Sequence, residues 1–156
     1  MSGTINSPRW TIESSVRSLL KQNSMLQNVY ISDHREVKVR PCITVVTQDL
    51  KELNLGAQPA AVGGYQSGVF DGMVMITLEE KINASSETQS SQLWESVIQC
   101  LHQDTLLSTL LTESIPDPLT VYFATTEDYN ETVDDTLKMW VKTVSLRVKF
   151  MCRVNA

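Results

Sequence analysis

The sequence predicts a single α+β domain, spanning residues 1–156, in which two helices pack on one face of a mainly antiparallel sheet of about four to five strands. Three observations lead to this class. The length suits one ordinary domain, and 42% of the residues are hydrophobic. Residues 144–154 alternate between an apolar and a mostly polar face, as a half-buried strand does. The order of elements, α-β-β-β-α-β-β, has no βαβ rhythm, which argues against a doubly wound parallel sheet.

Two segments carry helical patterns. Ser7 and Pro8 suit an N-cap and the first helical position, and the helix is expected to end near Asn23. Its apolar stripe consists of Ile12, Val16, Leu19 and Leu20. The second helix is expected to begin near Gln89, with Leu93, Val97 and Leu101 on one side and Trp94 and Ile98 beside them. A further leucine-rich turn, over 104–111, ends before Pro116.

The other segments favour strands. A short apolar run over 28–32 precedes an alternating run from Val37 to Val46, which Pro41 interrupts. Residues 49–55 suggest a short helical turn, and the glycine-rich stretch 56–68 a long loop. The strand that follows places Gly72, Val74, Ile76 and Leu78 on one face, so that loop and strand together predict a β-arm. Residues 119–125 predict another strand. The last strand, over 144–154, is expected to lie centrally under the helices.

No pattern in the sequence indicates a catalytic, cofactor or metal site. Cys100 and His102 lie two apart on a helix, so their side chains diverge by roughly 200°. Ser67 is one position late for a nucleophile elbow and precedes a strand. His34 and His102 lack partners at metal-ligand spacing. Cys42, Cys100 and Cys152 are expected to be small buried hydrophobic residues.

Charge and termini restrict the partners. With 13 basic and 18 acidic residues, the net charge is −5, and the basic residues are scattered, which disfavours a grip on duplex DNA. The first ten residues lack the apolar core of a signal peptide, and no run suits a membrane helix. We therefore expect assembly in a cytoplasm, without a membrane partner.

Five carboxylates gather between residues 127 and 135, where we expect a solvated acidic turn. They lack the spacing of a calcium loop. Trp140, which precedes the last predicted strand, suits either the core or an interface. The acidic residues are Glu127, Asp128, Glu131, Asp134 and Asp135.

The arrangement as a whole resembles the tail terminator, or tail completion, proteins of tailed phages. The resemblance rests on the leading helix (Ile12 to Leu20), the proline-containing strand, the glycine-rich loop with its long strand (Gly68 to Ile82), the leucine-rich helix and the closing strand. It covers nearly the whole chain, as a pattern of elements without a signature motif.

The resemblance implies a non-enzymatic virion protein of the tail or neck. It implies a hexameric ring of identical copies that caps the tail tube, stops tube polymerisation and docks to the head–tail connector or neck protein. The acidic residues would then line a lumen through which DNA passes without specific binding. Contact with neighbours or tube is expected at Gly63, Gly64, Tyr65, Gln66, Met73, Met75 and Trp140.

Alternative functions stay open at this point. The chain could be another neck or tail component, such as a head-closure protein or a tube subunit. From different classes, a small hydrolase would need a pocket with a perturbed titratable group, and a regulatory binding module would stay monomeric or dimeric until its partner arrived.

Overall fold

The computed structural model describes residues 8–32, 41–53, 65–83, 86–102 and 119–155, and it confirms the predicted α+β class. Five strands form one sheet in the spatial order β1-β2-β3-β5-β4. β1 pairs with β2 in parallel, and every other pair is antiparallel. The strands are β1 (Tyr30–Ser32), β2 (Cys42–Glu52), β3 (Tyr65–Lys81), β4 (Leu119–Asp134) and β5 (Met139–Asn155).

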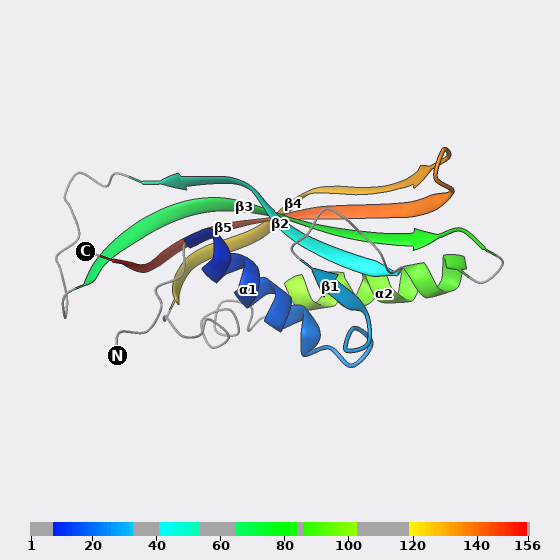
Figure 1. Cartoon of the computed structure of the whole chain (residues 1–156), viewed down its shortest axis with the longest axis horizontal. Helices are drawn as coiled ribbons and strands as arrows, with labels where there is room; N and C mark the ends of the chain where they lie inside the picture. Colours follow the sequence, from blue (N-terminus) through cyan, green and yellow to red (C-terminus); the bar gives the residue numbers. More distant parts are fainter. Residues whose placement is uncertain (1–7, 33–40, 54–64, 84–85, 103–118, 156) are drawn as a thin grey trace.

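Both helices lie on the same side of the sheet (Figure 1). α1 (Pro8–Lys21) packs mainly against β2, and α2 (Ser86–Leu101) packs against β3 and β5. The last strand lies inside the sheet, between β3 and β4, as its length predicted. No helix among the described residues is long and apolar enough to span a membrane.

The core lies between the helices and the inner strands. Because side chains alternate across a strand, the even-numbered residues of β3 and β5 meet the helices. The rings of Phe70 and Phe150 stack with their centroids 5.8 Å apart. Gly72 permits this packing, since a Cβ there would lie 3.1 Å from Cδ1 of Leu50 and 3.6 Å from Cε1 of Phe150. The fully buried strand residues include Ile43, Val45, Val74, Ile76, Leu78, Leu146, Val148 and Phe150.

The structure corrects four predicted boundaries. Residues 49–52 continue β2 and do not form a helical turn, and residues 65–68 belong to β3 and not to a loop. α2 begins at Ser86, three residues before the expected Gln89. The acidic stretch is not a turn, because β4 continues to Asp134 and the chain turns over 135–138. The predictions for residues 33–40, 56–64 and 103–118 lie outside the described part of the chain.

Candidate assembly surface

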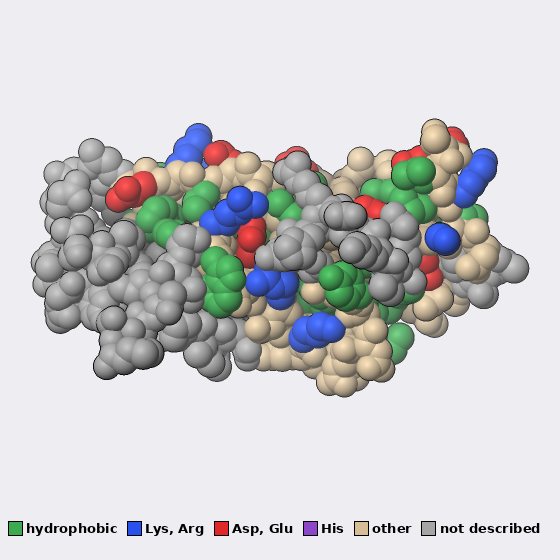
Figure 2. Space-filling view, viewed as in Figure 1, with side chains coloured by type: hydrophobic (Ala, Val, Ile, Leu, Met, Phe, Trp, Pro, Cys, Tyr) green, Lys and Arg blue, Asp and Glu red, His purple; other side chains and the backbone are tan. Residues whose placement is uncertain are grey.

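The outer edge of β4, here called the β4 edge, is the most distinctive surface of the described molecule. Among the described strands, only β5 pairs with β4, which therefore forms one border of the sheet. Five of the nine exposed large hydrophobic side chains lie on β4 or in the turn that follows it. They are Tyr122, Phe123, Tyr129, Val133 and Leu137, each 41–60% exposed. At the right-hand end of Figure 2, hydrophobic and acidic side chains lie next to one another on this hairpin.

Two irregularities shape this strand. Its register with β5 shifts between Val121 and Phe123 and again between Glu127 and Asn130. At the second shift Asp128 has a φ of 56°, in the left-handed region that aspartate tolerates better than most residues. Bulges bend a strand and redirect its side chains. The two shifts divide β4 into three paired segments, 119–121, 123–127 and 130–134, and the side-chain alternation restarts at each of them.

Two side-chain contacts hold β4 to α2 and to His102, the residue after this helix; one lies before the second register shift and one lies within it. Nε1 of the buried Trp94 donates a hydrogen bond to Oη of Tyr129 at 2.8 Å, and the two rings lie 6.0 Å apart. The Tyr129 hydroxyl in turn donates to Oε2 of Glu131 at 2.8 Å. Oγ1 of Thr126 lies 3.3 Å from Nε2 of His102. Desolvation and the bond to Glu131 raise the pKa of Tyr129, so its hydroxyl stays protonated and able to donate.

The five carboxylates of this region divide into three kinds. Oε1 of Glu127 lies 3.9 Å from Nη1 of Arg147, and Oε1 of Glu131 lies 3.3 Å from Nζ of Lys142. Side chains of β5 therefore partly neutralise both carboxylates. Oδ1 of Asp134 accepts the N–H groups of Thr136 and Leu137, both at 3.0 Å, and so closes the turn. Asp128 and Asp135 form no ion pair within the described ranges and are exposed.

A small pocket of about 220 Å³ opens beside the second half of β4. Lys142 lines it and is nearly buried, with Nζ 6.0 Å from the centroid of the Trp140 ring. Glu80 is buried, and in the β3–β5 register it pairs with Trp140, which lines the pocket. Burial raises the pKa of Glu80, although Lys142 opposes the shift. The pocket is lined by Glu87, Ser91, Glu131, Thr132, Val133, Trp140 and Lys142.

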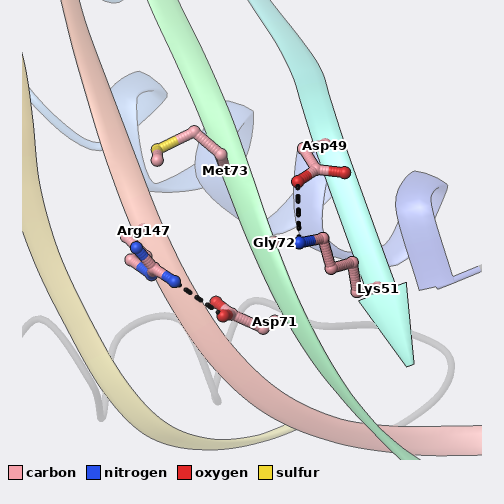
Figure 3. Close-up of a pocket in the computed structure, with 6 residues that line it drawn as sticks. All are labelled: Asp49, Lys51, Asp71, Gly72, Met73 and Arg147. Atoms are coloured by element: carbon pink, nitrogen blue, oxygen red, sulfur yellow. Dashed lines mark hydrogen bonds and ion pairs between the residues drawn. The ribbon is translucent and has the colours of Figure 1, made fainter. Parts of the chain in front are cut away.

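The opposite face of the sheet, which no described helix covers, is charged in a balanced way. Nη2 of Arg147 lies 3.0 Å from Oδ2 of Asp71, and Nζ of Lys51 lies 4.0 Å from Oδ2 of Asp49 (Figure 3). The bond to Asp71 raises the pKa of the already cationic Arg147. A shallow hollow of about 210 Å³ lies between these pairs and Met73. Alternating signs on neighbouring strands stabilise a sheet, so this face has a structural explanation.

The residues predicted to contact neighbours fall on several surfaces. Met73 and Met75 lie together on the helix-free face, half-buried. Trp140 lies in β5, half-buried at the pocket on the other side of the sheet. Tyr65 and Gln66 open β3, in register with Asn155 and Val154, while Gly63 and Gly64 lie outside the described residues. The predicted contact role of these residues stays a prediction.

The residues considered for chemistry occupy structural positions. Cys42 and Cys100 are buried free thiols, as expected, and burial raises the pKa of Cys100 despite a hydrogen bond with Asn23. His102 is exposed and contacts Thr126. Ser67 lies within β3, in register with Arg153. The described part of the chain contains no group of three or more histidine, cysteine or carboxylate residues that could hold a metal ion.

Sequence reasoning missed the aromatic part of the β4 edge. By the sequence pattern, Tyr122 and Phe123 belong to a short predicted strand and Tyr129 to the predicted acidic turn. A usable signal was present: between Leu119 and Asp134 there is no lysine, arginine or proline, the residues that commonly protect an edge strand.

Comparison with known proteins shows the fold. No protein-family model matches the sequence, and no curated protein matches it significantly. A solved chain from the virion of a native gene transfer agent (GTA) particle superposes with a TM-score of 0.55 over 90% of this chain and 94% of its own length, at 10% identity. A second solved chain covers 91% of this chain and 96% of its own length at 11% identity, with a TM-score of 0.37 that is too low to carry an argument.

Proposed function

We propose that this protein is a non-enzymatic structural subunit of a phage-like virion and, within that class, a tail terminator that forms a hexameric ring. The observation that carries the virion role is the shared fold with a chain of a gene transfer agent virion, which extends over nearly the whole of both chains. The finer assignment rests on the resemblance of the sequence pattern to tail terminator proteins.

The shape of the sheet supports assembly from identical copies. Its two borders differ, with β1 and β2 at one and β4 at the other. A contact between unlike surfaces of neighbouring copies forms a ring if the rotation closes and a filament if it does not. A terminator must close its ring, accept the tube on one face and refuse another ring on the opposite face. On this proposal its partners are further copies of itself, the tube protein and the neck.

The acidic residues of β4 and its turn are the proposed lumen surface. Carboxylates repel phosphates, so DNA would pass without binding. Asp135 is the cleanest position for a test, because Asp134 also caps the turn. We expect Asp135→Lys rings to retain DNA and slow its ejection, while Asp134→Asn keeps the turn and ejects nearly normally. Unchanged ejection from Asp135→Lys particles would remove the lumen assignment.

The ring itself is tested by the mass of the purified protein in solution, together with electron micrographs of the same sample and of a sample mixed with tail tubes. A terminator gives six-fold species, alone or on the tube, and one ring at the tube end. Long tubes built from this protein alone would instead identify a tube subunit. A monomer that ignores the tubes in the mixture would contradict both assignments.

A further inference from the structure

Within the described residues, the β4 edge has bulges but lacks the lysine, the proline and the covering helix that would prevent pairing with another chain. An exposed edge strand presents a row of backbone N–H and C=O groups, and natural proteins usually protect it with lysine, proline or a short strand. β4 has 16 residues, none of them lysine, arginine or proline. Its hydrophobic side chains are well exposed, at 51% for Tyr122, 48% for Phe123 and 54% for Tyr129. These features leave the edge open to pairing with another strand.

The same edge is also prepared in advance. The contacts of Tyr129 with Trp94 and of Thr126 with His102 hold the middle of β4 to α2 and to the residue that follows it. A strand that is already held in its bound conformation loses less conformational entropy when a partner pairs with it. Strand addition then draws affinity from main-chain hydrogen bonds and specificity from pockets for alternate side chains.

Charge determines which partner fits. β4 carries Glu127, Asp128, Glu131 and Asp134 without a single basic residue. Arg147 and Lys142 compensate two of these from β5, and the turn that follows adds Asp135 and Lys138, so five carboxylates face three cations and the net charge stays negative. A nucleic acid is repelled by such an edge, and an acidic peptide is too, whereas a peptide with lysine or arginine is attracted.

The pocket beside Val133 adds a place for one side chain. Its volume of about 220 Å³ is below the roughly 300–1,000 Å³ typical of small-molecule sites. The Trp140 ring and Val133 supply apolar walls. The lining also holds one cation, Lys142, which is paired with Glu131, so Glu87 at the start of α2 is the carboxylate left for a partner. An arginine or lysine suits these walls, since its aliphatic stem packs on apolar surface while its charge meets a carboxylate.

We propose that the β4 edge binds an extended basic segment of a partner protein by strand addition, with one lysine or arginine of that segment entering the pocket between Trp140 and Glu87. The proposal goes beyond the ring assignment, because it concerns the chemistry of the partner and does not require six-fold closure. A bound basic segment would cover the carboxylates of β4 itself, so the lumen role would then fall to Asp135 in the turn that follows the strand.

The probe is a ten-residue peptide of alternating valine and lysine, compared with its valine–glutamate counterpart. Binding is measured by titration at two salt concentrations, and the backbone amides of β4 are followed by hydrogen exchange. We expect the basic peptide to bind, more weakly in high salt, and to slow exchange of the β4 amides. Val133→Lys should weaken binding about tenfold, since it places a like charge at the pocket.

The matched control is Met25→Lys, which makes the same kind of change at a side chain that is 50% exposed and lies before β1, away from β4 in the sheet order. It should change binding less than about twofold. Phe123→Lys is a second edge variant, at a site 48% exposed, and circular dichroism confirms that each variant is folded.

Four results would each overturn the proposal. They are no binding of the basic peptide, binding that leaves exchange at β4 unchanged, equal binding of the acidic peptide, and equal effects of Val133→Lys and Met25→Lys. Rings in micrographs together with any of these would leave the ring proposal standing and remove only this one. Peptide binding by a protein that never forms rings would leave this proposal standing and remove the ring proposal.

Discussion

The two borders of the sheet are built in opposite ways. At the β2 border, β1 pairs with Cys42, Ile43 and Thr44, and beyond them Oε2 of Glu13 on α1 accepts the N–H of Thr47 at 2.6 Å. The register then shifts between Thr47 and Asp49, and the exposed residues that follow are polar or charged. At the β4 border, aromatic side chains and carboxylates are exposed along a long strand.

This difference separates a border that is closed by its own chain from one that is available to another. A covering helix, a bulge and an exposed lysine are standard ways to prevent edge pairing. The β2 border has all three, in α1, the shift at Thr47 and Lys51. The β4 border has bulges but neither of the other two devices along its outer side, within the described residues. Strand order alone therefore does not show whether a sheet border can pair with another chain; the side chains along that border do.

The largest expected effect comes from a substitution that removes the contact of α1 with the β2 border. Glu13→Ala removes the acceptor for the Thr47 N–H and leaves a buried donor unsatisfied, so we expect a loss of about 1–3 kcal/mol in the free energy of unfolding. Urea denaturation measures it. Glu95→Ala, at an exposed position of α2, is the control and should stay within about 0.5 kcal/mol. Equal losses in the two variants would show that Glu13 does not hold this border.

A smaller effect is expected at the β4 border, where Trp94 of α2 donates a hydrogen bond to Tyr129. Tyr129→Phe deprives the Trp94 N–H of its acceptor, which should cost about 1 kcal/mol and speed amide exchange in the middle of β4. Tyr30→Phe, another exposed tyrosine, should have little effect on either quantity. If exchange in β4 stays unchanged in Tyr129→Phe, the edge is not held by this contact.

The buried Glu80 gives the same region a pH dependence. Burial raises the pKa of Glu80 in the folded state above the ordinary 4.5. At pH values between 4.5 and this raised pKa, the folded protein therefore binds more protons than the unfolded chain. Stability therefore falls as pH rises through this window. Thermal unfolding at several pH values from 4 upward measures the fall, and Glu80→Gln should flatten it. A slope that is identical in the variant would assign the dependence to other groups.

The smallest expected effect is on stability when the edge is protected artificially. Phe123→Lys adds a charge at an exposed site, so the free energy of unfolding should change by less than about 0.5 kcal/mol. Self-association should fall, which light scattering at rising concentration would show, while Met25→Lys leaves it as it was. A large loss of stability would place Phe123 in the core and weaken the comparison between the borders.

The sequence predicted the inner strands and helix cores well, because burial on one face imposes alternation there. Val74, Ile76, Leu146 and Val148 all face the helices as their spacing indicated. It failed at β4, where residues 127–134 look like a turn by composition. An edge strand needs no apolar alternation, and the bulge at Asp128 breaks the period.

The candidate surface was predictable only in part for a related reason. The five acidic residues stood out in the sequence, but their neighbours did not. Lys142 and Arg147 come from β5, and Trp94 comes from α2, so the contacts that define the β4 edge join residues far apart in the chain. Local patterns report such contacts poorly, because they are set by strand order.

The decisive measurement is a cryo-EM map of the protein assembled on a tail tube together with its neck partner. The account predicts that the sheet continues past β4 into a strand of another chain, with basic side chains of that chain near Glu131 and Asp134. A map in which the outer edge of β4 faces solvent in every subunit, while copies join through other surfaces, would contradict it.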